Sequence, residues 1–367
     1  MPPARTLRKG NTVSASLRLS RRARTGGVAV ALCLLAAACG SSSKSASGSG
    51  SVTLNGSGST FQKTFDQVAI QAFQQANSGI TVNYAGGGSG KGKTDLQTKT
   101  VDFAGTDSLP KPADLPKYQG GELLYFPTVA APITVSYNLS GVKDLRLSDT
   151  TLAKIFALKI TKWNDPAIAK DNPSAKLPST TITVAHRADG SGTTSNFTKF
   201  LAAADPTDWT LGSGDTVDWP SGTQAGTGNP GVAQVVQQTD GAIGYVDLAD
   251  AKKSNLTFAS IQNKSGAFVT PTTAGAAAAV ASSTINANLT YDPINAPGAQ
   301  AYPITSPTWI LVYAKQTDKK KGDALKTFLQ FVYDKGETLA ESNNYAPLPS
   351  DLVQKAVAQL SQLQIPA

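Results

Sequence analysis

Apolar and polar residues alternate along the chain in two different periods. Between residues 61 and 76 the apolar positions recur every three or four residues, which predicts an amphipathic helix. Short apolar or alternating runs before and after this segment are typical of strands. In the first half of the chain the predicted strands are 52–54, 80–84, 101–104 and 133–137.

The same two patterns continue to the carboxyl end. Ser148 or Asp149 is placed to cap a helix that carries Leu152, Ile155 and Phe156. Further predicted strands are 182–185, 242–246 and 309–313, and further helices are expected around 197–201, 324–333 and 352–363. No segment repeats with a period of 20–50 residues. The alternation predicts an α/β fold with ligand chemistry in the loops after strand carboxyl ends.

The amino terminus has the pattern of an export signal. A basic stretch precedes the apolar run Val28–Ala38, which is shorter than the about 20 apolar residues that span a membrane. Residues 1–38 are therefore predicted to be a signal peptide. The run LLAAAC resembles the lipobox of bacterial lipoproteins, although Ala36 stands where that family usually has Leu. This implies a lipid on Cys39; ordinary cleavage after Ala38, which would give a secreted protein, is the alternative.

A Gly/Ser-rich segment, residues 39–50, separates the signal from the predicted body. A flexible chain of this length and composition spans about 20 Å. We expect it to be a tether that holds the body near the outer face of the cell membrane.

The net charge of +8 is unevenly distributed. Seven of the 33 basic residues lie before residue 25, and no acidic residue precedes Asp66. Subtracting these seven leaves 26 basic against 25 acidic residues, so the body gives no reason to expect nucleic-acid binding. Both cysteines, Cys33 and Cys39, belong to the amino terminus and His186 is the only histidine. No metal, cofactor or cysteine nucleophile is expected.

Three Gly-rich segments, 56–61, 86–92 and 190–193, each come directly before a predicted helix. Helix N-termini and Ser/Thr hydroxyls donate hydrogen bonds to small oxyanions, and Arg187 adds a planar charged donor. Taken singly, such segments are also ordinary turns. Together they favour an anion site without proving one.

Gly87–Thr94 also satisfies the nucleotide P-loop pattern. An exported protein meets little ATP, so a nucleotide site is not expected. Lys91 and Lys93 are interpreted as solvated loop charges, and His186 as a residue that flanks the site. The four tryptophans are interpreted as packing residues: Trp163, Trp209, Trp219 and Trp309.

Eight segments, in order along the chain, resemble a single family. They are GSGSTF (56–61), YAGGGSGKGK (84–93), VDFAGTDSLP (101–110), FPTVAAPITVSYN (126–138), ITKWNDPAIA (160–169), RADGSGTTSNFTKFL (187–201), GAIGYV (241–246) and YPITSPTW (302–309). The family is that of the phosphate-specific periplasmic binding proteins, the solute receptors of high-affinity phosphate ABC importers. RADGSGT is the most specific of these motifs.

The resemblance implies a two-lobed periplasmic-binding-protein fold of type II-like topology, with the ligand cleft between the lobes. Residues 51–131 and 303–367 would form the first lobe, and residues 132–302 the second. The implied function is an extracytoplasmic receptor, not an enzyme, that binds inorganic phosphate and delivers it to an import permease. We expect a monomer.

The family's phosphate ligands correspond to eight positions of this sequence. The implied donors are Thr60, Phe61 (through its backbone N–H), Ser89, Arg187, Ser191, Gly192 and Thr193. Asp107 would accept the proton of phosphate, which sulfate lacks, and would thereby select against sulfate. Asp189 would either hold the Arg187 guanidinium or cap the next helix.

Two alternatives belong to other classes. An exported phosphatase would use a Ser or Thr hydroxyl, but a Ser-His-Asp triad would have to recruit His186 and no G-x-S-x-G sequence accompanies it. A receptor for sulfate or molybdate is the second alternative, and Asp107 argues against both anions.

Overall fold

The computed structural model describes residues 51–367. The predicted signal, Cys39 and the predicted tether lie outside the described residues. Within them, no helix combines the length and the apolar composition that crossing a membrane requires.

Most strands belong to a single nine-stranded sheet with the order β2-β1-β3-β12-β4-β8-β6-β7, and β9 (Thr257–Phe258) pairs with β4. Two groups of strands in it are parallel. The first group is β1 (Val52–Gly58), β2 (Ile80–Gly86) and β3 (Phe103–Thr106). The second is β6 (Thr183–Arg187), β7 (Gln224–Gly226) and β8 (Ala242–Asp247). We call the residues around the first group the first lobe and those around the second group the second lobe.

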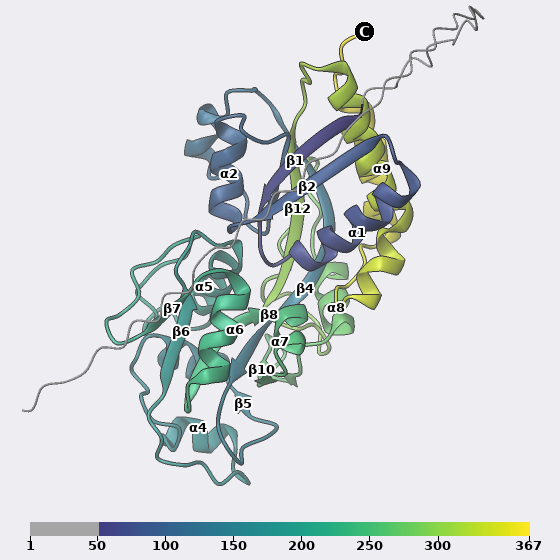
Figure 1. The fold of residues 1–367 in the computed structure, drawn as a ribbon. Helices are drawn as coiled ribbons and strands as arrows, with labels where there is room; N and C mark the ends of the chain where they lie inside the picture. The colour runs from purple at the N-terminus through teal and green to yellow at the C-terminus, as the bar shows by residue number, and fades with distance from the viewer. Residues whose placement is uncertain (1–50) are drawn as a thin grey trace, which may run out of the picture. The chain divides into compact units, whose positions relative to one another are not determined.

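The long strand β4 (Leu123–Tyr137) joins the two groups (Figure 1). It pairs with β12 (Thr305–Tyr313) as far as Pro132 and with β8 from Ile133 onward. Its side chains are buried along almost the whole strand. A strand covered on both faces is apolar without alternation, which explains the run PTVAAPITV.

Helices cover both faces of the first lobe's strands. α1 (Lys63–Ala76) and α9 (Lys319–Ser342) lie together on one side, where Phe73 meets Phe328 at 5.2 Å between ring centroids (Figure 1). α2 (Ser89–Gln97) lies on the other side and contacts β1 and β3. α10 (Ser350–Gln359) and the short 3₁₀ helices η1 (Pro112–Lys117) and η2 (Leu360–Gln362) complete this lobe.

The second lobe is organised around aromatic packing. Phe197 lies between Phe156 and Tyr245, with ring centroids 4.6 and 4.5 Å away. Its helices are α3 (Asp149–Phe156), α4 (Pro166–Asp171), α5 (Gly192–Ala204), α6 (Gly228–Gln238), α7 (Leu248–Lys253) and α8 (Thr273–Ala281). A small sheet consists of β5 (Arg146–Leu147), β10 (Ser260–Gln262) and β11 (Phe268–Val269).

The predicted α/β alternation is confirmed, and the predicted strands all occur, mostly with longer ends. The predicted cap of α3 is Ser148, whose hydroxyl accepts from the Thr151 N–H. The interpretation of the tryptophans is also confirmed, because Trp163, Trp209 and Trp309 are buried and Trp219 stacks on other rings.

Candidate functional site

The loops that follow the parallel strands of both lobes meet at one place. In the first lobe, residues 59–62 follow β1, residues 87–88 follow β2, and Asp107 follows β3. In the second lobe, β6 ends at Arg187. The two lobes touch directly here, since the Gly90 N–H donates to the Gly190 carbonyl at 3.0 Å. This is the position at which α/β sheets hold ligands.

Asp107 lies at the centre of this contact and is almost fully buried. Its Oδ1 accepts from the Ser89 hydroxyl at 3.0 Å, and its Oδ2 accepts from the Thr193 hydroxyl at 3.2 Å. Burial raises the pKa of the Asp107 carboxyl, and the surrounding donors and the Arg187 charge oppose that rise. The structure thus places a buried acceptor among donors of both lobes.

Arg187 brings the positive charge into the same contact and is 4% exposed. Its Nε donates to Asp189 Oδ1 at 2.9 Å, its Nη2 pairs with Asp189 Oδ2, and its Nη1 donates to the Thr193 hydroxyl at 3.4 Å. Desolvation alone would raise the pKa of Asp189, but the Arg187 hydrogen bonds and charge hold that pKa below its ordinary value. Asp189 thus holds the guanidinium by a bidentate pair. It does not cap the next helix, α5, because Ser191 does.

The start of α5 is shaped for close approach to the first lobe. Ser191 is its N-cap, with its hydroxyl accepting from the Thr194 N–H at 3.1 Å. A Cβ at Gly192 would lie 2.6 Å from Ser89 Oγ and 2.7 Å from the Asp107 carboxyl carbon. Only glycine allows α5 to come this near.

The start of α1 supplies two more of the predicted residues. Phe61 is buried, its N–H donates to the Ser59 hydroxyl at 3.0 Å, and its carbonyl accepts from Tyr345 at 2.6 Å. Thr60 joins the site through Asn229, whose amide Nδ2 donates to the Thr60 hydroxyl at 3.2 Å.

The structure thus brings all eight predicted positions to the facing loops of the two lobes. Ser89, Asp107, Arg187 and Thr193 form one hydrogen-bonded network, and Gly192 packs against it. Ser191 caps the helix that carries Gly192 and Thr193. Cys39 lies outside the described residues.

Asn229, at the start of α6, is the residue of this site that the sequence reasoning missed. It is fully buried, and its amide Nδ2 donates to hydroxyls of both lobes, Thr60 and Thr193, at 3.2 Å each. A signal was present in the sequence, because GTGNPG at 226–231 is a fourth Gly-rich segment before an apolar helical pattern.

The interpretation of Lys93 as a solvated loop charge is wrong. Lys93 lies inside α2, and its ammonium pairs with Asp215 of the second lobe at 2.7 Å and donates to the Ser108 hydroxyl at 2.9 Å. Only 13% of its side chain is exposed. Lys91, by contrast, is half-exposed and pairs with Asp95 on its own helix.

The P-loop pattern at Gly87–Thr94 does not have a P-loop's geometry. α2 begins at Ser89, so Lys93 follows more than one turn into the helix and is paired with Asp215. A P-loop lysine instead reaches phosphates gathered at the helix start.

His186 takes no part in the network described above. Its ring stacks on Trp219 with centroids 4.9 Å apart, and desolvation lowers its pKa. Within residues 51–367, no group of three or more His, Cys, Asp and Glu side chains is arranged to hold a metal ion.

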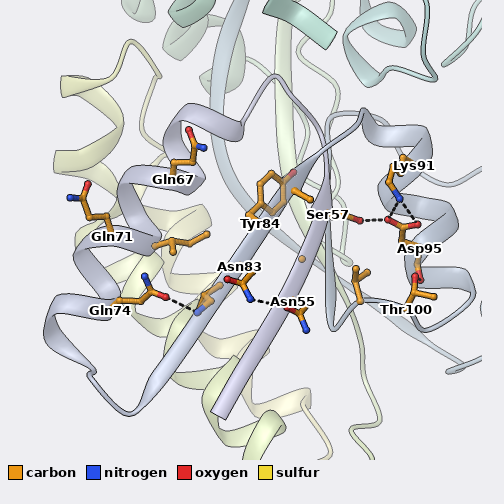
Figure 2. A pocket seen from close by; sticks show the side chains of 15 residues that line it. Asn55, Ser57, Gln67, Gln71, Gln74, Asn83, Tyr84, Lys91, Asp95 and Thr100 are labelled. Carbon is orange, nitrogen blue, oxygen red and sulfur yellow. Dashed lines mark hydrogen bonds and ion pairs between the residues drawn. The ribbon is translucent and has the colours of Figure 1, made fainter. Parts of the chain in front are cut away.

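A separate open groove of about 870 Å³ lies over β1 and β2, between α1 and α2 (Figure 2). Amide side chains line it, among them Asn55, Gln67, Gln71 and Asn83. None of the eight predicted site residues belongs to this lining.

The chain matches known proteins over most of its length. A family model of the PBP superfamily domain matches residues 43–335. The phosphate-binding protein PstS of Pasteurella multocida is 37% identical over 313 residues, which cover 84% of this chain and 89% of the relative. The phosphate-binding protein PstS of Methanocaldococcus jannaschii is 35% identical over 326 residues, covering 82% of this chain and 84% of the relative.

The fold agrees with a solved structure of a high-affinity periplasmic phosphate-binding protein bound with phosphate. The TM-score is 0.70 at 24% identity, over 86% of this chain and 96% of that one. The chain therefore belongs to the PBP superfamily and, within it, to the family of the PstS phosphate-binding proteins. The resemblance inferred from the motifs and the two-lobed periplasmic-binding-protein fold are confirmed.

Proposed function

We propose that this chain is an extracytoplasmic receptor that binds inorganic phosphate and delivers it to the permease of an ABC-type phosphate importer. One observation carries the proposal: a buried carboxylate, Asp107, lies among the donors Ser89, Thr193 and Arg187. A carboxylate beside an anion is repulsive unless the anion brings a proton to share. HPO₄²⁻ and H₂PO₄⁻ bring one, and fully ionised sulfate does not.

The donors suffice for tight binding. Micromolar affinity needs about 8 kcal/mol, and each hydrogen bond to a charged group contributes about 1.5–3 kcal/mol. Several donors from two lobes can therefore offset desolvation of the anion. The binding set is proposed as the eight predicted residues, with Asp189 in support. Asp107 is the acceptor, and the donors are Thr60, Phe61, Ser89, Arg187, Ser191, Gly192 and Thr193.

The borders of the lobes belong to the same proposal, 51–131 with 303–367 and 132–302. The partner change of β4 supports them, because β4 leaves β12 at Pro132 and joins β8 at Ile133. Bending at this point would open and close the contact between the loops.

Calorimetry of the purified protein, freed of phosphate, tests the function. We expect one phosphate per chain and no displacement by excess sulfate. In Asp107→Asn the amide offers a donor instead of a carboxylate, so we expect sulfate to compete and phosphate to bind at least 10-fold more weakly. Equal competition by sulfate in the wild-type protein would refute phosphate selectivity.

We further propose that the protein is not a phosphatase. The only histidine, His186, stacks on Trp219 instead of reaching a hydroxyl of the site. Incubation with a chromogenic phosphate ester, with and without divalent metal ions, should release no product. Sustained release proportional to protein concentration would overturn the receptor proposal.

Anchoring through a lipid on Cys39 is proposed from the lipobox resemblance. We expect Cys39→Ser to move the protein from the membrane fraction of its cells to the soluble exported fraction. An unchanged membrane fraction would argue for another mode of retention.

A further inference from the structure

The start of α6 carries a residue that touches both lobes and is not one of the eight proposed ligands. We propose that Asn229 is a positioning residue that fixes the direction of two site hydroxyls, so that Thr60 and Thr193 act only as donors. The inference rests on the proposed function, because the donors are those assigned to phosphate.

The orientation of the Asn229 amide is set by its backbone surroundings. The Asp247 N–H donates to Asn229 Oδ1 at 3.2 Å, so the amide oxygen faces β8. The amide nitrogen then faces the loops of the site, where each of its two hydrogens has one acceptor: the hydroxyls of Thr60 and Thr193. Asn229 and Thr193 are fully buried, and Thr60 is partly buried.

The Thr60 hydroxyl can donate a hydrogen bond to a ligand but cannot accept one. Its oxygen accepts from the Asn229 backbone N–H at 3.1 Å and from Asn229 Nδ2 at 3.2 Å. A hydroxyl has two acceptor positions and one proton. With both acceptor positions filled by Asn229, Thr60 can only donate.

The Thr193 hydroxyl is constrained in the same way from the second lobe. It accepts from Arg187 Nη1 at 3.4 Å and from Asn229 Nδ2 at 3.2 Å, and it donates to Asp107 Oδ2 at 3.2 Å. Its proton is therefore directed toward the centre of the site.

Asn229 therefore restricts which ligand groups the Thr60 and Thr193 hydroxyls can bind. Two hydroxyls from opposite lobes, which could otherwise accept as readily as donate, present only protons. A ligand group that must itself donate, such as an ammonium, finds no acceptor in them, whereas an anionic oxygen is satisfied. One amide thus makes these two hydroxyls donors, leaves Asp107 as the acceptor for the proton of phosphate, and connects the lobes at the same time.

The test compares the effect of Asn229 substitutions in the wild-type protein and in a variant without the two hydroxyls. It uses the purified full-length protein, with phosphate as the probe and calorimetry as the readout. We expect Asn229→Ala to weaken phosphate binding at least 10-fold. Asn229→Asp keeps the size but replaces the donor with an acceptor that attracts both hydroxyl protons, so it should weaken binding further. In a Thr60→Val/Thr193→Val background, which has no hydroxyls to direct, Asn229→Ala should change affinity by less than 2-fold.

A matched control is Asn172→Asp, because Asn172 is a buried asparagine whose amide bonds Arg146 and Ile168, away from the site. It should lower thermal stability and leave phosphate affinity unchanged. Wild-type affinity retained in both Asn229 variants, or an equal loss in both backgrounds, would overturn the inference while the wild-type protein still binds phosphate. Absence of phosphate binding by the wild-type protein would instead overturn the proposed function.

Discussion

The behaviour of a buried carboxyl in this protein depends on its hydrogen-bond partners. Asp107 and Asp66 are both buried carboxyls of the first lobe, but their neighbours differ. Asp107 has hydroxyl donors of both lobes, whereas Asp66, on α1, accepts from the Gln62 amide at 2.9 Å. Asp66 has no cation among these partners, so of these two carboxyls it is the one that has no opposite charge to offset the cost of burying its ionised form.

Asp66 predicts a pH-dependent stability. Desolvation raises the pKa of Asp66 from 3.8 to about 7, despite the Gln62 hydrogen bond. Between these two values the folded protein binds more protons than the unfolded chain, so the free energy of unfolding falls as pH rises from about 4 to about 7. The loss is at most about 1.4 kcal/mol per pH unit. Asp66→Asn should lack this slope.

Urea unfolding at several pH values measures the difference. The stability of Asp66→Asn relative to the wild-type protein should increase from pH 5 to pH 8. Asp323→Asn is the control, since the Asp323 side chain is more than half exposed. The free energy of unfolding of this variant should change with pH in the same way as that of the wild-type protein. If the free energy of unfolding of Asp66→Asn has the same pH dependence as that of the wild-type protein, Asp66 is not the titrating group.

The residues found from sequence and those missed differ in one physical respect. Ser89, Asp107 and Arg187 stand in local motifs, and resemblance was enough to place them. Lys93 and Asn229 act through partners in the other lobe, Asp215 and Thr60, which no local pattern identifies. Long-range pairing was therefore the information that the sequence pattern lacked.

At the scale of elements, periodicity identified several helices but missed α6 and α8, for different reasons. α8 is almost entirely alanine and glycine with one valine, so it shows no amphipathic alternation. α6 begins with Gly-Asn-Pro-Gly, which reads as a turn until the apolar positions Val232, Ala233 and Val236 are considered with it. β4 was predicted from 133 to 137 only, because the part before residue 133 contains Pro127 and Pro132 and pairs with a strand far along the chain.

The start of α5 gives a prediction about helix approach. Gly192→Ala suits the helical backbone, but the added methyl would lie 2.6 Å from Ser89 Oγ. Overpacking of this kind costs about 1–3 kcal/mol, so phosphate affinity should fall about 10-fold or more while each lobe stays folded. Calorimetry and thermal unfolding together measure the two effects.

Gly79→Ala is the matched control, because a Cβ at Gly79 meets no atom within 4 Å. It should bind phosphate as the wild-type protein does. Wild-type affinity in Gly192→Ala would mean that α5 and α2 do not need this close contact for binding.

For the whole molecule, near-neutral charge and anion binding are compatible because the donors are local. Apart from the amino terminus, the chain has 26 basic and 25 acidic residues, after subtraction of the seven early bases from 33. Many of its lysines lie in surface pairs, such as Lys154 and Lys159 with Asp208. Surface pairs of this kind contribute little to stability, so the charges that matter are the ones at the contact between the lobes.

Lys93 and Asp215 are the pair that spans this contact. Their charged atoms lie 2.7 Å apart, and Asp215 also accepts from the Ser108 hydroxyl at 2.7 Å, while its carbonyl accepts from the Ser191 N–H at 2.9 Å. Lys93→Met would leave Asp215 without its cation when the lobes are together. Removing one partner of a mostly buried pair is strongly unfavourable, so we expect about 10-fold weaker phosphate binding, expressed as faster release.

Stopped-flow release of phosphate separates this effect from a loss of folding. Lys91→Met is the matched control, because Lys91 lies on the same helix but pairs with Asp95 within the first lobe and is half-exposed. Its release rate should equal that of the wild-type protein. In an Asp215→Asn background, where no buried anion needs a cation, Lys93→Met should accelerate release much less. Equal acceleration in both backgrounds would show that Lys93 acts on the anion itself, through its positive charge, and not by holding the two lobes together.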